Sequence, residues 1–144
     1  MQASSVSRQI AELDRALLEQ RFATVLELCS KGDVAGVAAY FTPDVVYAGG
    51  TWRYYLLAQR REGREACAEM LQALYVTYES LGSRIDFLTV EGDRAALKRT
   101  TRLRHRGNGK VADVAICNFL QLRDGLICEY SEFPDTLAIA ELDE

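Results

Sequence analysis

Hydrophobic and polar residues follow a helical period in the first half of the chain. Over residues 7–30, and again over 63–81, apolar side chains recur at spacings of three and four, which predicts two amphipathic helices. A shorter helix is predicted over 33–40, because its first residue is an aspartate, a favourable N-cap. Pro43 ends this helical phase, and the β-branched and aromatic residues of 44–49, DVVYAG, predict a strand.

The second half of the chain alternates between apolar and polar residues instead. Four segments do so: 83–91, 94–106, 110–123 and 126–133. Short glycine-bearing turns separate them, which predicts consecutive antiparallel hairpins. Residues 50–62 show no clean period and are interpreted as an irregular loop or a short strand. This order of elements predicts an α+β fold in which helices pack on one face of a curved sheet.

The composition is that of a soluble globular protein and narrows the function classes. The 144 residues fit one domain, 1–144, in which 1–16 form an N-terminal helical extension. Apolar residues make up 49% of the chain and charged residues 26%. The net charge of −4 indicates no basic face for nucleic acid, and no segment is apolar enough to span a membrane. Since no signal peptide is recognised, a cytoplasmic location is expected.

Four cysteines and one histidine offer little metal chemistry. Cys29, Cys67, Cys117 and Cys128 are too far apart for a Cys-x-x-Cys site, and their apolar neighbours predict small buried thiols. His105 stands beside a predicted turn and is expected at the surface. No glycine-rich phosphate-binding or dinucleotide-binding motif is found. The sequence therefore predicts neither a metal nor a cofactor.

Polar residues interrupt the apolar faces of three consecutive predicted strands. Successive side chains of a strand point to opposite faces, so each strand has one more apolar face. On these faces lie Arg99, Asn118 and Glu132, flanked by Thr101 and Tyr130. An unpaired charge buried in a protein costs several kcal/mol, so Arg99 and Glu132 are expected to pair with each other.

A carboxylate held by an arginine and an amide is typical of general acid/base sites. We therefore expect the concave side of the sheet to enclose a pocket with a polar centre and apolar walls. Such a pocket suits a mostly apolar small molecule. Its predicted walls include Leu103, Val114 and Ile116, which share the inward faces of their strands.

Each of these residues also has a purely structural interpretation, which the sequence leaves open. Glu132 could be solvated near the strand end or bridge a subunit interface. Arg99 could serve as an ion-pair partner alone, and Asn118 as a satisfied core amide. Three aromatic residues of 50–62 could form a ligand lid, although packing is the favoured interpretation: Trp52, Tyr54 and Tyr55.

Four stretches carry a family resemblance: GDVAGVAAYFTPDVVYAGG, REGREACAEML, VEGDRAALKRTTRLRHRGNGK and NFLQLRDGLICEYSEFPDT. They resemble the SnoaL-like branch of the NTF2-like superfamily, over residues 17–142. The resemblance implies a cone of curved antiparallel sheet packed against three to four N-terminal and central helices, commonly dimeric through the sheet. Members include polyketide cyclases, ketosteroid isomerases, limonene-1,2-epoxide hydrolases and non-enzymatic binders.

Among these members the residues compare most closely with the epoxide hydrolase, where two aspartates, an arginine, a tyrosine and an asparagine activate water. Arg99 takes the position of the arginine, Glu132 that of the second carboxylate and Tyr47 that of the tyrosine. Thr101 stands in place of the acid aspartate, and Gly49 in place of the asparagine. The base of a ketosteroid isomerase would fall near Tyr47. The resemblance implies Glu132, Arg99 and Tyr47 as the catalytic set.

The expected function is binding of an apolar small molecule in the cone, with Glu132 as general acid or base oriented by Arg99. The residues expected to contact the ligand are Thr101, Leu103, Val114, Ile116, Asn118, Tyr130 and Trp52. One alternative is a non-catalytic ligand carrier or sensor, which the missing carboxylate at position 101 favours. A second is an interaction module that uses the outer face of the sheet. A homodimer formed through the sheet is expected from the resemblance.

Overall fold

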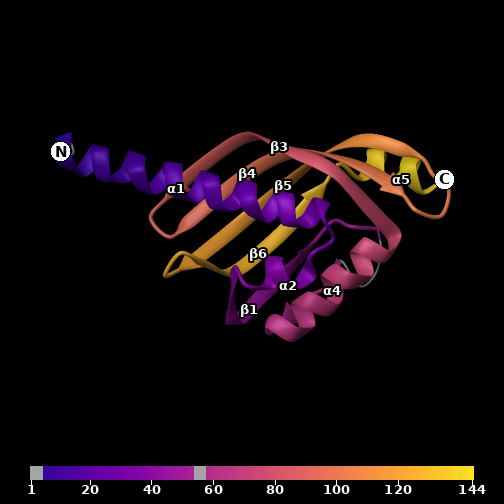
Figure 1. Cartoon of the computed structure of the whole chain (residues 1–144), viewed down its shortest axis with the longest axis horizontal. Coiled ribbons are helices and arrows are strands. Elements are labelled where there is room, and N and C mark those ends of the chain that lie inside the picture. Colours follow the sequence, from indigo (N-terminus) through magenta and orange to yellow (C-terminus); the bar gives the residue numbers. More distant parts are fainter. Residues whose placement is uncertain (1–4, 54–57) are drawn as a thin grey trace.

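A strongly curved six-stranded sheet forms the centre of the computed structural model, which describes residues 5–53 and 58–144 (Figure 1). The strand order is β2-β1-β6-β5-β4-β3. Their bounds are β1 Phe41–Gly50, β2 Arg61–Glu62, β3 Tyr78–Glu91, β4 Arg94–His105, β5 Val111–Arg123 and β6 Leu126–Pro134. The antiparallel pairing of β3 to β6 in succession confirms the predicted hairpins.

The sheet is mixed, which corrects the expectation of a wholly antiparallel sheet. Strand β1 pairs with β6 in parallel, and with the short β2 in antiparallel orientation. The long connection through β2 to β5 leaves the chain free to bring β6 alongside β1 in the same direction. Pro43, expected to precede the strand, lies inside it. The β1–β6 register shifts between Phe41 and Val46, so the missing N–H of the proline falls where regular pairing is interrupted.

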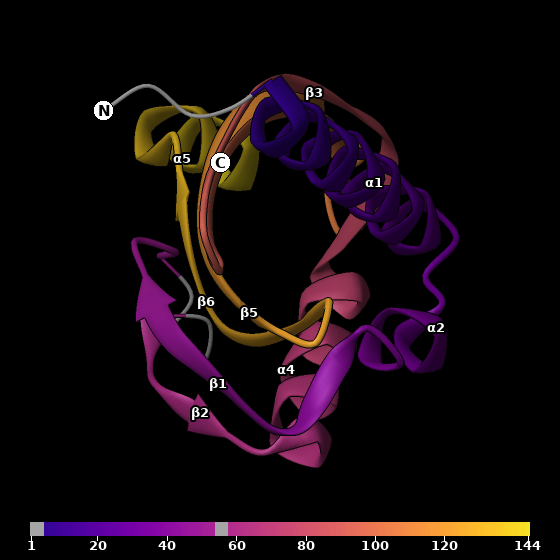
Figure 2. The ribbon, with the colours of Figure 1, turned by 90° about the vertical axis from the view of Figure 1, so that its left-hand side faces the viewer.

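Among the described elements, helices α1, α2 and α4 cover the concave side of the sheet, and α5 lies apart from them (Figure 2). Their bounds are α1 Ser5–Ser30, α2 Val34–Ala38, α4 Arg64–Thr77 and α5 Thr136–Asp143. The N-terminal end of α1 projects beyond the sheet (Figure 1). Asp33 caps α2 as expected, because its side chain accepts from the backbone N–H of Gly36. Within the described part of the chain, none of the helices has the length and apolar character needed to cross a bilayer.

Two helical features differ from the sequence expectation. The apolar stripe predicted a helix through Leu81, but α4 ends at Thr77 and Tyr78 already pairs with β4. Cross-strand pairing here outweighs the helical period. The short helix α5 was not expected from its sequence. It begins at Asp135, whose carboxylate accepts from two backbone N–H groups of its first turn.

The predicted alternation of inward-facing and outward-facing residues (strand parity) is confirmed in β4 and β5 and is broken once in β6. In β4 the odd-numbered residues from 95 to 103 are buried, and in β5 the even-numbered residues from 114 to 122. In β6, Leu122 pairs with Ile127 but Gln121 pairs with Glu129, so Cys128 is an extra residue in a bulge. Ile127 therefore faces the core in place of the predicted Cys128. Beyond the bulge, Tyr130 and Glu132 share the inward face as expected.

The four thiols are free, and they are less buried than the sequence suggested. Cys67 is buried completely, whereas Cys29, Cys117 and Cys128 are half-buried. Cys117 lies on the outward face of β5, which parity assigns to solvent. The expectation of four buried thiols is therefore correct for one of them.

Gly50 allows β1 to approach β6 unusually closely. A Cβ atom at Gly50 would lie 1.6 Å from the backbone oxygen of Glu132, so only glycine fits. The next residue, Thr51, donates its backbone N–H to the same oxygen at 3.1 Å. This contact places the segment after β1 directly beside Glu132.

Tyrosine side chains form part of the core under this sheet. Tyr47, Tyr78 and Tyr130 are buried, and the rings of Tyr47 and Tyr130 lie 4.9 Å apart. Burial is the main cause that raises the pKa of all three hydroxyls above the ordinary value for tyrosine. The folded chain keeps them protonated where an unfolded chain would release the protons.

These tyrosines predict unfolding at alkaline pH. In the unfolded chain they ionise near pH 10, whereas folded they stay protonated, so stability is full below about pH 10 and falls as the pH rises. The tyrosinate absorbance of these residues is expected to rise together with the loss of circular dichroism. A chain unfolded in urea, titrated as the control, ionises near pH 10. Ionisation of every tyrosine at that pH in a fully folded chain would contradict the prediction.

Candidate functional site

Arg99 is the centre of a polar network on the concave face. It lies in the middle of β4, is 9% exposed, and donates three hydrogen bonds. Its Nε donates to Oδ1 of Asn118 at 3.0 Å, Nη1 to Oγ1 of Thr101 at 2.7 Å, and Nη2 to Oε1 of Glu132 at 3.0 Å. The ion pair that strand parity predicted between Arg99 and Glu132 is thus present.

Glu132 accepts hydrogen bonds at both carboxylate oxygens. Asn118 lies directly opposite it on β5, and its Nδ2 donates to Oε1 at 3.1 Å, beside the Arg99 contact. The indole Nε1 of Trp52 donates to Oε2 at 3.0 Å. The side chain of Glu132 is 15% exposed, so it does not extend into bulk solvent. Three donors compensate for the desolvation of this charge.

Thr101 belongs to the network through its hydroxyl. Its Oγ1 accepts from Arg99 and lies 2.7 Å from the hydroxyl of Ser83 on β3. A threonine here keeps the arginine in place but supplies no second carboxylate. The position that resembles the acid of the epoxide hydrolase therefore serves, in this chain, as a hydrogen-bond partner of Arg99.

Trp52 has a more specific place than the favoured packing interpretation gave it. Its ring packs 5.9 Å from Tyr78, and its N–H holds the second oxygen of Glu132. A buried indole N–H needs an acceptor, and this requirement is the sequence signal that could have suggested the contact. Tyr54 and Tyr55, predicted beside it, lie outside the described residues.

Two small cavities flank the Arg99–Glu132 pair, with volumes of about 60 Å³ and 50 Å³. Both are bordered by Cys29, Leu71, Arg99 and Glu132. The first cavity continues to residues of α1, α2 and the β1–β6 end of the sheet: Phe22, Val25, Leu26, Val37, Phe41, Leu97, Asn118, Leu120, Ile127 and Tyr130. The second continues toward α4 and β3: Trp52, Leu74, Tyr75, Tyr78, Ser80, Thr101, Leu103 and Ile116.

Six of the predicted ligand-contacting residues therefore border a cavity, and one does not. Val114 is fully buried in the sheet core and borders neither cavity. Tyr47 is also fully buried and borders neither, although it packs on Tyr130. The charge of Glu132 adds to burial in raising the pKa of the Tyr47 hydroxyl, which places Tyr47 within electrostatic reach of the carboxylate.

The helices contribute pocket residues that the sequence reasoning missed. Cys29 ends α1 beside the ion pair, and Leu71 and Tyr75 reach it from α4. Burial raises the pKa of the Cys29 thiol, which keeps it neutral. The apolar stripes of the two helices were the available signal, but a stripe does not tell which of its residues faces a cavity.

His105 is less exposed than the sequence predicted, and the described residues of metal-binding type do not cluster. His105 was expected at the surface, but its side chain is 21% exposed and its ring packs edge-on against Tyr78 at 5.5 Å. Its Nδ1 accepts from the backbone N–H of Gly107 at 3.0 Å. Within 5–53 and 58–144, the histidine, cysteine and carboxylate side chains form no group of three that could hold a metal ion.

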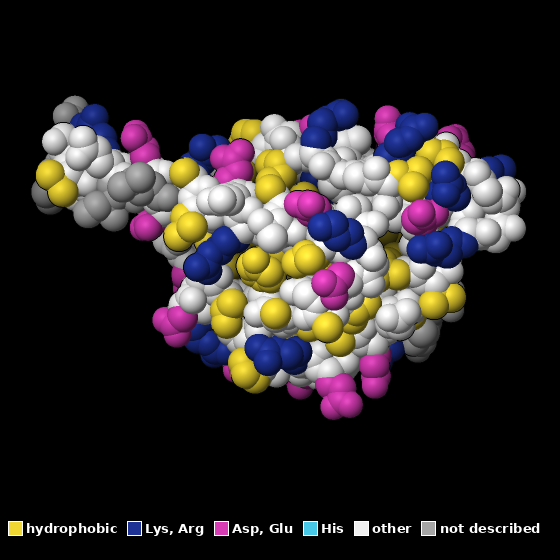
Figure 3. All heavy atoms as spheres, viewed as in Figure 1, with side chains coloured by type: hydrophobic (Ala, Val, Ile, Leu, Met, Phe, Trp, Pro, Cys, Tyr) yellow, Lys and Arg dark blue, Asp and Glu magenta, His cyan; other side chains and the backbone are white. Residues whose placement is uncertain are grey.

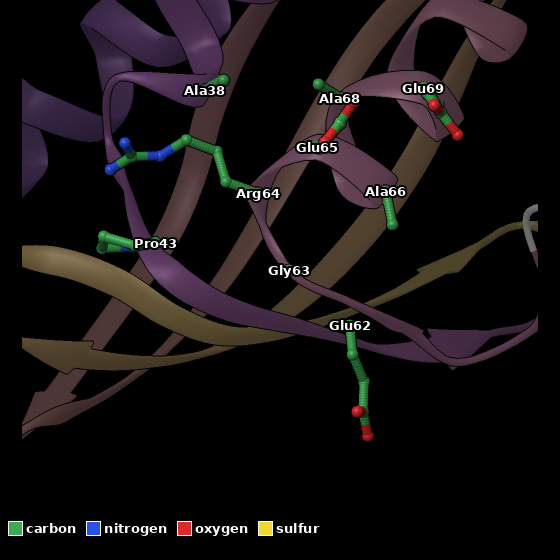
Figure 4. Close-up of a pocket in the computed structure, with 9 residues that line it drawn as sticks. All are labelled: Ala38, Pro43, Glu62, Gly63, Arg64, Glu65, Ala66, Ala68 and Glu69. Carbon is green, nitrogen blue, oxygen red and sulfur yellow. The ribbon is translucent and has the colours of Figure 1, made fainter.

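A much larger hollow, of about 810 Å³, lies at the start of α4 (Figure 4). It is open to solvent and shares no residue with the two cavities. Its polar side chains include Glu65 and Glu69, while Arg64 turns to donate to the backbone oxygen of Phe41. Without an enclosed polar group, it is a weaker site candidate than the cavities beside Glu132.

Solved structures with similar folds come from several activity classes. A proposed isomerase from Bacillus subtilis superposes with a TM-score of 0.78 at 13% identity, covering 92% of this chain and 94% of its own. A proposed polyketide cyclase from Xanthomonas campestris gives 0.72 at 18%, covering 90% and 98%. An LEH-like epoxide hydrolase from M. tuberculosis gives 0.69 at 16%, covering 89% and 90%. At these identities the likeness establishes the fold alone.

The family comparison is more direct. No curated protein matches the chain. The family model of the SnoaL-like domain matches residues 6–130, which is most of the chain. The curved sheet, the helices on its concave side and the structural neighbours agree with that match. The chain belongs to the SnoaL-like family and has the fold of the NTF2-like superfamily.

Proposed function

We propose that this protein binds a small, mostly apolar molecule beside Glu132 and that Glu132 transfers a proton to or from it. One observation carries the proposal: a nearly buried carboxylate, held by three donors, borders two apolar cavities. Hydrophobic atoms also reach the surface between α1 and the elements below it, on the side where the cavities lie under the helices (Figure 3).

The hydrogen bonds of the ion pair leave an acceptor position on Glu132 and donors on Arg99 for a reacting molecule. Oε1 of Glu132 accepts two bonds, whereas Oε2 accepts one, from Trp52, so Oε2 retains a lone pair. Arg99 uses three of its five N–H donors, and no acceptor for the other two is found among the described residues. A base and a donor for a developing oxyanion therefore lie side by side.

The single carboxylate selects among the reactions of similar proteins. Among the described residues that border the two cavities, Glu132 is the only carboxylate. An epoxide hydrolysis that uses two carboxylates does not fit, because Thr101 stands at the position of the acid aspartate. A proton transfer next to a carbonyl, as in an isomerisation or an aldol-type cyclisation, needs one base and one oxyanion donor. We propose this class, with Tyr47 positioning Tyr130 and Asn118 orienting the carboxylate.

A non-catalytic ligand carrier or sensor is the second candidate. One observation favours it, the missing carboxylate at position 101. The cavities are far below the roughly 300–1,000 Å³ of typical ligand pockets, which limits the ligand under either candidate. The small volume favours a compact ligand, or requires α1 to move before a larger one enters. Under this candidate the ligand binds and leaves unchanged.

The outer face of the sheet supports a proposed homodimer. Phe119 and Phe133 pack edge-on at 5.9 Å and remain 56% and 40% exposed, and Phe87 is 62% exposed. The register places Phe87, Lys98, Cys117 and Phe133 in one row across four strands. Arg102 and Asp113 pair with each other further along the same outward face, so a second copy related by a twofold axis would meet both charge signs. A second copy is therefore the proposed occupant of this face.

Glu132→Gln tests the proposed chemistry. The amide keeps the shape but cannot take a proton, so turnover is expected to fall about 10²–10⁴-fold. The unfolding free energy is expected to fall by about 3–5 kcal/mol, because the buried Arg99 loses its counter-charge and the indole of Trp52 loses its acceptor. Turnover is measured on a β,γ-unsaturated ketone, an epoxide and an aldol-cyclising diketone, and folding by circular dichroism.

Glu129→Gln is the matched control, because Glu129 lies on the same strand outside both cavities. It is expected to leave turnover unchanged. If Glu132→Gln fails to fold, Glu132→Asp retains the charge but withdraws it by one methylene, and should lower turnover in a folded protein. Full turnover in Glu132→Gln would refute the catalytic role, and a bound but unchanged ligand in native mass spectra would favour the carrier.

Phe119→Asp tests the dimer. A charge beside the exposed ring of Phe133 is expected to raise the dimer dissociation constant by at least roughly 30-fold. Sedimentation velocity over a concentration series measures this. Val76→Asp, at a 66% exposed position of α4, is the control and should leave association unchanged. A wild-type chain that sediments as a monomer at every concentration would exclude the dimer.

A further inference from the structure

Three buried hydroxyl groups in the pocket region are poorly paired among the described residues: those of Ser80 and Tyr130 have no hydrogen-bond partner, and that of Tyr75 has only the thiol of Cys29. Nearby hydroxyls are bonded. Tyr78 donates to Asp143, and Ser83 and Thr101 bond each other. Unpaired buried atoms therefore belong to particular side chains, and away from the two cavities they include Oγ1 of Thr42 and Nε of Arg64.

The three hydroxyl-bearing residues lie on opposite sides of the ion pair. Tyr130 borders the first cavity, while Tyr75 and Ser80 border the second. Arg99 and Glu132 form the wall that the two cavities share. A molecule that lies across this wall would have its middle at the carboxylate and one end in each cavity.

An unpaired buried hydroxyl lowers stability, and phenylalanine or alanine would fill the same space without this loss. Tyr75 has the thiol of Cys29 beside it, which is a weak partner at best. Tyr130 is 6% exposed and packs its ring on Phe41 and Tyr47, so its hydroxyl cannot turn to bulk water without disturbing both contacts. Partners supplied by a ligand would explain why polar side chains occupy these positions.

We propose that the ligand is a compact molecule with an apolar carbon skeleton and a neutral oxygen function, hydroxyl or carbonyl, at each end. One oxygen pairs with Tyr130, and the other with Ser80 and Tyr75. Neutral ends follow because Arg99, in the shared wall, is the only cationic side chain among the described residues that border the cavities. This inference rests on the proposed function, since it places the reacting centre of the same ligand at Glu132.

The probes are linear α,ω-diols of three to eight carbons, each compared with the 1-alkanol of the same length. Binding is measured by isothermal titration and by amide shifts in NMR spectra of the full chain. At the length that spans the two cavities, the diol is expected to bind about tenfold more tightly than the alkanol. Tyr130→Phe and Ser80→Ala should each remove most of this advantage.

Matched variants separate a ligand partner from a structural role. In the unliganded protein, Tyr130→Phe and Ser80→Ala remove unpaired hydroxyls and are expected to leave Tm unchanged or raise it by about 2–4 °C. Tyr78→Phe and Ser83→Ala, which lie on β3 with Ser80, remove paired hydroxyls and are expected to lower Tm by a similar amount.

Equal binding of diols and alkanols at every length, or no binding of either, would overturn the inference. So would a fall in Tm in Tyr130→Phe and Ser80→Ala, because the hydroxyls would then be paired within the protein or through resident water. The proposed chemistry fails separately. If Glu132→Gln keeps full turnover and the diol preference is intact, only the catalytic role of Glu132 is refuted. If Glu132→Gln loses turnover but the protein shows no diol preference, only this inference is refuted.

Discussion

The buried ion pair of Arg99 and Glu132 is the interaction on which the rest of the site depends. Removing two charges from water costs several kcal/mol for each, and a single contact does not offset this. The structure surrounds the pair with donors and acceptors from β3, β4, β5 and the segment after β1. The close approach of β1 to β6 at Gly50 also helps to compensate the charge, because it brings Trp52 to the second oxygen of the carboxylate.

That arrangement also decides which chemistry is compatible with the site. The fold occurs in proteins described as isomerases, cyclases and epoxide hydrolases, so it does not select an activity. The activity proposed for this chain rests instead on the residues at the ion pair. Glu132 supplies one carboxylate, Arg99 supplies unused N–H donors, and Thr101 supplies only a hydroxyl to the network. One base beside one cationic donor suits proton transfer at carbon better than attack of water on an epoxide.

The helices and the two faces of the sheet have different roles in this interpretation. The concave face and the helices α1 and α4 enclose the apolar space, in which Cys29 and Leu71 stand opposite the ion pair. Tyr75, Ser80 and Tyr130, whose hydroxyls are buried and poorly paired, border that space. The convex face carries exposed phenylalanines instead, on which the proposed dimer rests.

Local patterns in the sequence were sufficient for the α+β class, the hairpins and the inward faces of β4 and β5. Alternation is a property of each strand alone, and a buried charge requires a partner. The contact among Arg99, Asn118 and Glu132 could therefore be predicted from the sequence. The parallel pairing of β1, the bulge at Cys128, the start of β3 at Tyr78 and the helix α5 could not. Each depends on how segments far apart in the chain fit against one another. The same holds for the indole of Trp52 and for Cys29 and Tyr75, because only the packing of helices on a curved sheet decides which of their side chains reach the carboxylate.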